Sequence, residues 1–256
     1  MSWPTWTPAA LSSERRRVSG ACWRVVEAQH RISTLKLVDT LVEQARLEEL
    51  LEQSKPPVPL ECAHLQYLLA TPFRYGSPYP RGSRFRRAGR TPGVFYASKT
   101  IATAIAEMAC HRLLFFADSP ATPWPGNAGE YTAFAVRYRT AAGLDLTAPP
   151  LDRDRAVWVH PTDYRPCQAL ADAARDTHIE ALRYQSARDP RPGSLNVALL
   201  SCRAFASSAP IERETWRVLF NPQGVHAICA FPESCLAFDR EAFAADPRIA
   251  GMVWDR

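Results

Sequence analysis

The sequence predicts an α+β protein with a largely antiparallel sheet, flanking helices and a helical extension at the N-terminus. Strand-like patterns outnumber helical ones in the second half of the chain, and Pro/Gly turns separate them. Their connections are not regular strand–helix–strand units. The sequence also contains no glycine-rich dinucleotide fingerprint or phosphate loop. These observations favour an α+β fold over a doubly wound parallel sheet.

The composition is that of an ordinary globular protein, and we expect a cytoplasmic location. Apolar residues make up 46% and charged residues 22% of the 256 positions, enough for one large domain with an appendage. The N-terminus lacks the apolar core of a secretory signal, and no apolar run approaches the length of a membrane span. The seven cysteines form no CxxC pair, and the six histidines show no metal-binding spacing. We therefore expect free thiols and no metal site.

Residues 1–59 are expected to form an arm followed by a helical extension. The first 20 residues are rich in Pro, Ser and Arg, which predicts a frayed arm. A helix capped by Ser33 or Thr34 should follow and end before Pro56, because proline cannot continue the hydrogen-bond ladder. Its apolar stripe consists of Leu37, Val38, Leu41, Val42, Ala45, Leu50 and Leu51.

Residues 60–256 are expected to form the main domain. After a turn-rich segment, Ser98 or Thr100 should cap a helix whose core face contains Ile101, Ile105 and Met108. An Ala/Leu-rich pattern predicts a further helix over residues 168–175. Strands are expected at 94–97, 131–139, 144–146, 179–185, 197–200, 216–220 and 225–231.

A cluster of arginines marks the turn-rich segment, whereas lysine is scarce throughout the chain. Arginine suits bidentate recognition of phosphate or carboxylate, and the glycines at 82 and 89 allow a backbone to approach a ligand closely. The segment fits an anion-binding loop or a basic loop in solvent, and composition alone slightly favours the second. The arginines are Arg81, Arg84, Arg86, Arg87 and Arg90.

Two other polar side chains are candidates for chemistry. Glu107 lies away from the apolar stripe of its helix, among Thr and Ala, and close to a strand-to-helix join where site residues collect. The alternative is an ordinary carboxylate on a solvent-exposed helix face. Ser186 ends a predicted strand but lacks a Gly-x-Ser-x-Gly turn and a nearby His–Asp pair, so it is not expected to be a nucleophile. It fits either a turn cap or a ligand hydrogen bond.

Three segments in order resemble the RES domain family. They are 73–75 with 82–85, then 93–98 leading to 103–107, and finally 182–188 with 196–200. The family is named after an Arg, a Glu and a Ser, which match Arg84, Glu107 and Ser186. The resemblance covers about residues 60–230, within the usual size of one domain.

This resemblance implies an ADP-ribosyltransferase-like fold and a toxin that cleaves the nicotinamide–ribose bond of NAD by phosphorolysis or hydrolysis. NAD would be the substrate, inorganic phosphate a candidate co-substrate, and no cofactor would be needed. The implied partner is an antitoxin with a helix-turn-helix DNA-binding part that occludes the active site. A homodimer of this chain within the complex is a further expectation. We do not expect the chain to bind a membrane or to bind nucleic acid directly.

The resemblance also implies roles for single residues. Glu107 would stabilise an oxocarbenium-like transition state, and Arg84, helped by Arg74, would bind the pyrophosphate. Tyr96 and Tyr75 would contact the nicotinamide ribose, and Ser186 would orient Glu107 or the ribose hydroxyls. The catalytic set is thus Glu107, Arg84, Tyr96 and Ser186, and the substrate-binding set is Arg74, Tyr75, Arg84, Tyr96 and Ser186.

Two alternatives stay open at this point. The chain could transfer ADP-ribose to a macromolecular or small-molecule acceptor. It could instead be a non-enzymatic nucleic-acid-binding module that uses the arginine loop, with Phe73 and Phe85 as stacking platforms. The shortness of the basic run and the scarcity of lysine speak against the second alternative.

Overall fold

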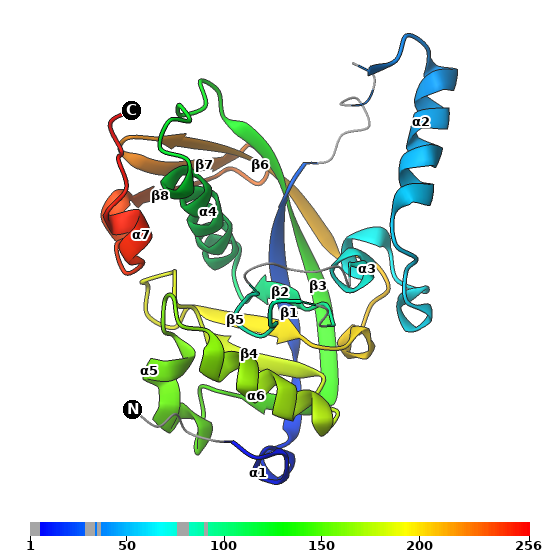
Figure 1. Cartoon of the computed structure of the whole chain (residues 1–256), viewed down its shortest axis with the longest axis vertical. Helices are drawn as coiled ribbons and strands as arrows, with labels where there is room; N and C mark the ends of the chain where they lie inside the picture. The colour runs from blue at the N-terminus through cyan, green and yellow to red at the C-terminus, as the bar shows by residue number, and fades with distance from the viewer. Residues whose placement is uncertain (1–5, 29–33, 35–36, 76–81, 90–91) are drawn as a thin grey trace.

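The chain forms an eight-stranded, mostly antiparallel sheet flanked by helices (Figure 1). The computed structural model describes residues 6–28, 34, 37–75, 82–89 and 92–256. The strand order is β1-β2-β5-β4-β3-β6-β7-β8, and β3 with β4 is the parallel pair. The strands are β1 Arg16–Glu27, β2 Phe95–Ser98, β3 Gly129–Asp145, β4 Ala181–Gln185, β5 Leu195–Leu199, β6 Glu212–Asn221, β7 Gly224–Cys229 and β8 Ser234–Asp239.

The helices lie around this sheet and complete an α+β architecture, as the sequence predicts. Figure 1 shows α4 beside β6 and β7, with α5 and α6 near β4 at the other end of the molecule. The narrower expectation of an ADP-ribosyltransferase-like arrangement stays a prediction. The helices are α1 Pro8–Ser13, α2 Leu41–Ser54, α3 Tyr67–Arg74, α4 Ile101–Asp118, α5 Arg155–Trp158, α6 Arg165–Asp176 and α7 Pro247–Ala250, with short 3₁₀ turns that include η2 Leu60–Cys62, η3 Leu151–Asp154 and η4 Cys202–Ala204.

Three adjacent strands bring distant parts of the sequence to one corner of the sheet. In β2, Ser98 lies opposite Asn196 of β5, and Asn196 lies opposite Tyr184 of β4. Helix α4 begins directly after β2, and the loop after β4 begins at Ser186. The end of β2, the start of β5, the end of β4 and the first turns of α4 therefore meet at this corner.

The N-terminal segment contradicts the prediction of a frayed arm in the part that is described. Strand β1 pairs with β3 from Arg16 opposite Gly143 to Glu27 opposite Tyr131, and it also contacts β2 at Trp23. Its backbone groups are satisfied by the long partner strand, although its own sequence alternates weakly in polarity. The sheet therefore extends across the boundary expected at residue 59.

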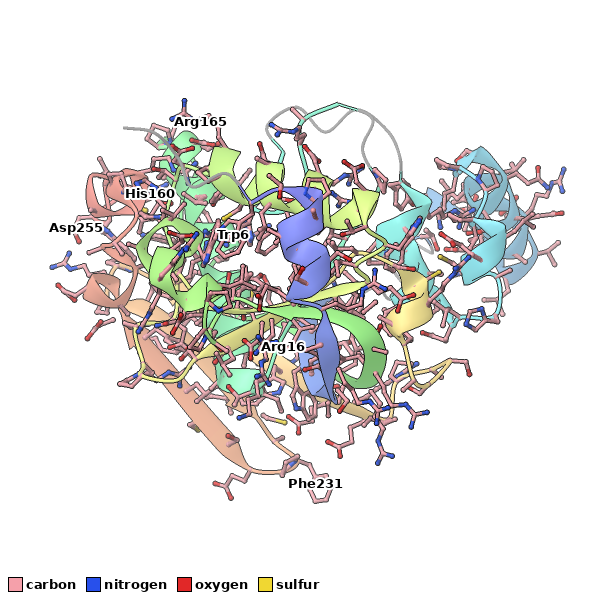
Figure 2. All side chains as sticks on the ribbon, turned by 90° about the horizontal axis from the view of Figure 1, so that it is seen from below. Trp6, Arg16, His160, Arg165, Phe231 and Asp255 are labelled. Carbon is pink, nitrogen blue, oxygen red and sulfur yellow. The ribbon has the colours of Figure 1, made fainter. Side chains whose placement is uncertain are left out.

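Helix α1 packs the N-terminal part of the described chain against the end of the molecule that contains α6 and the turn η3. Leu11 is fully buried in the same core cluster as α6. The indole of Trp6 donates a hydrogen bond to Asp154 in the turn η3 at 2.8 Å, and Figure 2 shows Trp6 beside this region. The segment from Trp6 through helix α1 is thus part of the folded domain.

The extension helix α2 exists, but its apolar side chains are not buried. It begins at the cap Thr40, whose side chain and that of Glu43 form a capping box. The prediction that Thr34 caps this helix is therefore wrong. The other expected cap, Ser33, lies outside the described residues. Leu41 and Val42 are 73% and 81% exposed, and Figure 1 shows α2 standing beside the body of the molecule.

The C-terminal part of the sheet ends in a hairpin of β7 and β8, of which the sequence predicts only the first strand. The strand expected at 225–231 stops at Cys229, and the chain returns as β8. Phe231 at the turn is 89% exposed and points away from the body in Figure 2. Within the described residues, none of the helices has the length and apolar character needed to cross a membrane.

Candidate active site

Helix α4 carries the central carboxylate of the site. The helix begins after Thr100, whose side chain accepts a hydrogen bond from the backbone of Thr103. Of the two caps expected, Thr100 is the one used, while Ser98 donates to the side chain of Asn196 at 2.7 Å. Glu107 lies two turns into the helix, at the sheet corner.

The carboxylate of Glu107 accepts three hydrogen bonds from side chains far away in sequence. Its Oε1 accepts from Ser186 Oγ at 2.7 Å and from Asn196 Nδ2 at 2.5 Å. Its Oε2 accepts from Arg188 Nη1 at 2.9 Å. The Glu107 side chain is 20% exposed and that of Arg188 is 12% exposed. The carboxylate is therefore fixed in a largely buried position. It does not lie on a solvent-exposed helix face, which was the alternative expectation for Glu107.

The turn after β4 determines the direction of the Ser186 hydroxyl. Ser186 Oγ accepts hydrogen bonds from the backbone amides of Arg188 and Asp189 at 3.2 and 3.0 Å. Two accepted bonds use the lone pairs of the hydroxyl, so its single proton is available for Glu107. Ser186 is thus a turn cap and also orients Glu107, which was one of the two roles expected of it.

Arg188 continues the network to a tyrosine at the start of α6. Its Nη2 donates to the hydroxyl of Tyr164 at 2.6 Å, and its Nη1 lies 3.5 Å from Nε2 of His111. The roles of Arg188, Tyr164 and Asn196 were missed by the sequence reasoning. Two of them lie in the segments that carry the family resemblance, but nothing local assigns them a partner.

Arg84 lies on the other side of Tyr164 and is buried. Its guanidinium carbon lies 4.9 Å from the centre of the Tyr164 ring, and Nη1 donates to the carbonyl of Trp158 at 2.5 Å. The whole residue is 6% exposed, and its Nη2 is buried without a hydrogen-bond partner. Buried polar groups are almost always paired, so this donor is a candidate for a ligand contact.

The structure does not bring Tyr96 to the carboxylate of Glu107. Its hydroxyl hydrogen-bonds to Ser83 Oγ at 2.8 Å and accepts from the amide of Phe85 at 3.0 Å. Burial raises the pKa of the Tyr96 phenol, and the hydrogen bonds from this loop oppose the rise only in part. Tyr96 therefore holds the turn that positions Arg84, and its expected contact with the ribose stays a prediction.

The remaining arginines of the basic segment are held by protein groups. Arg86 donates to the carbonyl of Tyr75 at 2.7 Å, and Arg87 forms an ion pair with Asp172 of α6. Arg81 and Arg90 lie outside the described residues. The described arginines therefore do not form one continuous anion-binding loop, which weakens the nucleic-acid alternative.

Arg74 and Tyr75 lie at the C-terminal end of α3, where they contact the N-terminal extension and the basic loop. Arg74 donates to the carboxylate of Glu52 in α2 at 2.6 Å and also to the carbonyl of Pro56. Among the described contacts, none joins Arg74 to Glu107. Its expected role at the pyrophosphate stays a prediction, and its observed role is to attach the end of α2.

The network determines the protonation state of Glu107. Burial acts to raise the pKa of its carboxyl group, but the charge of Arg188 and the hydrogen bonds from Ser186, Arg188 and Asn196 outweigh it. The net pKa lies below the usual value. At neutral pH, Glu107 is therefore an anion held by oriented donors.

This lowered pKa predicts a stability contribution that depends on pH. Because the folded-state pKa lies below the unfolded one, the contribution is present above the unfolded pKa of about 4.3 and is lost as pH falls through the folded value. We expect the difference in unfolding free energy between the wild type and Glu107→Gln to shrink as pH falls from about 5. Urea denaturation at several pH values measures it, and a constant difference would contradict this assignment.

One group of potential metal ligands occurs among the described residues, and it is separate from this network. Ligand atoms of Glu61, Cys62 and Cys202 lie within 4.8 Å of one another, between the turns η2 and η4. Burial raises the pKa of both thiols. The group contains none of the residues around Glu107.

A family model covers the segment that carries the site. The model of the RES domain family matches residues 58–221, well over half of the chain. The chain is also similar to the crystal structure of the M. tuberculosis MbcT-MbcA toxin–antitoxin complex, with 13% identity and a TM-score of 0.46, over 80% of this chain and 90% of that one. No curated protein matches the sequence.

Proposed function

The chain belongs to the RES domain family, and from this premise we propose that it is a toxin that cleaves the nicotinamide–ribose bond of NAD. The observation that carries the proposal is the anionic Glu107, fixed by three donors and linked through Arg188 and Tyr164 to the buried Arg84. One oriented negative charge, linked through Arg188 and Tyr164 to an unsatisfied cationic donor, suits a substrate that has a sugar and a pyrophosphate.

The residue types fit the chemistry of this bond. In NAD the nicotinamide is already a cationic leaving group, so no general acid is needed to expel it. The ribose gains positive charge as the bond breaks, and a preorganised carboxylate stabilises that charge. Glu107 would lie beside the anomeric carbon, with Ser186 and Asn196 preventing it from turning towards solvent.

The second feature that supports the proposal is the free Nη2 of Arg84. A guanidinium suits phosphate oxygens in bidentate geometry, and a buried one is desolvated before the ligand arrives. In this proposal Arg84 binds the pyrophosphate, which is in keeping with a carbonyl, an aromatic ring and the thiol of Cys167 as its described contacts, none of which is a carboxylate. NAD is then the substrate, and the chain needs no cofactor for this step.

The nucleophile that completes the reaction is water or inorganic phosphate. Hydrolysis converts NAD⁺ and water to ADP-ribose, nicotinamide and a proton. Phosphorolysis converts NAD⁺ and phosphate to nicotinamide and ADP-ribose carrying the phosphate on its anomeric carbon. Transfer to a protein or small-molecule acceptor would leave the ADP-ribose on that acceptor instead.

One experiment tests the function and the acceptor together. The purified chain is incubated with NAD, with and without phosphate, and the products are identified by ³¹P NMR and mass spectrometry. We expect free nicotinamide with ADP-ribose under both conditions if water is the acceptor, and free nicotinamide with a phosphorylated ADP-ribose only in the presence of phosphate if phosphate is the acceptor. Intact NAD under all conditions would refute the proposal, and ADP-ribose attached to an added acceptor would favour transfer.

We further propose that a partner protein controls this activity in the cell. The family membership supports an antitoxin with a helix-turn-helix part that covers the Glu107 network. Expression of the chain alone should then stop growth while cellular NAD falls, and co-expression with the product of a neighbouring reading frame should prevent both effects. Growth arrest at a constant NAD level would contradict the proposal.

A further inference from the structure

Tyr164 contacts both halves of the site through different parts of its side chain. Its ring lies 4.9 Å from the guanidinium carbon of Arg84, and its hydroxyl accepts from Nη2 of Arg188 at 2.6 Å. It is half-buried and occupies the N-cap position of α6. Its position in the sequence and its neighbours gave no reason to single it out.

The hydrogen bond to Tyr164 fixes the orientation in which Arg188 meets Glu107. Arginine–carboxylate pairs are often bidentate, with two N–H groups on two oxygens. Here Nη2 donates to Tyr164 and Nη1 donates to Oε2 of Glu107, while Oε1 accepts from Ser186 and Asn196. Of the two carboxylate oxygens, Oε2 therefore has one described donor and retains a lone pair.

We infer that Tyr164 is a positioning residue that couples the two halves of the site: its ring supports Arg84, and its hydroxyl holds Arg188 in the orientation in which it donates to Glu107. Oε2 is then the oxygen that faces the positively charged ribose. The inference rests on the proposed function for its catalytic consequence, but the geometry of the pair Arg188–Glu107 is independent of the substrate.

Two variants separate the role of the Tyr164 hydroxyl from the role of its ring. Tyr164→Phe keeps the ring below Arg84 and removes the hydroxyl, which leaves a buried N–H of Arg188 without its partner and loosens that side chain. We expect kcat to fall by about 10- to 100-fold with little change in KM. Tyr164→Leu also removes the ring, so KM for NAD should rise in addition.

A second readout does not depend on catalysis. Arg188 contributes to the low pKa of Glu107 because it is held at a fixed distance. The other titratable groups that interact with Arg188 include His111 and Cys110 of α4 and Asp246 at the start of α7. In Tyr164→Phe the pKa of Glu107, followed by ¹³C NMR of its carboxyl carbon, should rise relative to the wild type. Tyr131→Phe is the matched control, because it removes a hydroxyl from a buried tyrosine of β3 outside the network.

The outcomes distinguish the inference from the function. A wild type that cleaves NAD, with an unchanged kcat and an unchanged Glu107 pKa in Tyr164→Phe, would overturn the coupling and leave the function standing. A wild type that leaves NAD intact while the Glu107 pKa still rises in the variant would refute the function and support the coupling. A KM effect without a kcat effect in Tyr164→Phe would also overturn it.

Discussion

Glu107→Gln should reduce NAD cleavage by on the order of 100- to 1000-fold, the cost of removing one preorganised electrostatic contact. Glutamine has nearly the same shape, but it has no negative charge to stabilise the developing sugar cation. The carboxylate accepts three hydrogen bonds, and an amide oxygen can keep only some of them. Initial rates of nicotinamide release, compared with the wild type at saturating NAD, measure the effect.

The controls for this variant separate loss of charge from loss of fold. Glu49→Gln makes the same chemical change on α2, where the side chain is 54% exposed and pairs with Arg46, and it should leave activity unchanged. Because Glu107→Gln leaves the charge of Arg188 uncompensated, Glu107→Asp serves as a second variant that keeps the charge and withdraws it by one methylene. Full activity in a folded Glu107→Gln would contradict the proposed role.

The residues that could be predicted at this site were those at positions of the family motif. Arg84, Glu107 and Ser186 stand in motif positions, and the structure links all three in one network. The partners of Glu107 lie 79 to 89 residues away in sequence. Such contacts depend on strand register and leave no trace in local periodicity, so Asn196 and Arg188 could not be assigned roles.

The same limit explains the errors in the fold. Helix α4 and most central strands were predicted because their apolar residues repeat at the period of the element. Strand β1 was missed because its burial alternates weakly, and its stability comes from the paired length of β3. For α2 the periodicity predicted a helix, but periodicity alone cannot say whether the apolar residues meet a partner. In this structure they are exposed.

Arg84→Met should have opposite effects on stability and on substrate binding. In the wild type the guanidinium is buried against the carbonyl of Trp158, the ring of Tyr164 and the thiol of Cys167, and its Nη2 is unsatisfied. A buried charge without a carboxylate costs free energy, and an unbranched apolar side chain in its place removes that cost. We therefore expect the thermal midpoint to stay constant or rise, while KM for NAD increases by roughly 100-fold, equivalent to about 2.7 kcal/mol of lost binding.

The contrast with Arg183→Met makes the sign of this effect informative. Arg183 forms an ion pair with the buried Asp145, so its removal leaves that carboxylate without a counter-charge, and we expect a loss of roughly 1–3 kcal/mol with KM unchanged. A buried donor without a partner requires an explanation, and for Nη2 of Arg84 we propose a ligand as the missing partner. Differential scanning calorimetry with and without ADP-ribose checks this directly. If ADP-ribose stabilises Arg84→Met as much as the wild type, the ligand does not bind at Arg84.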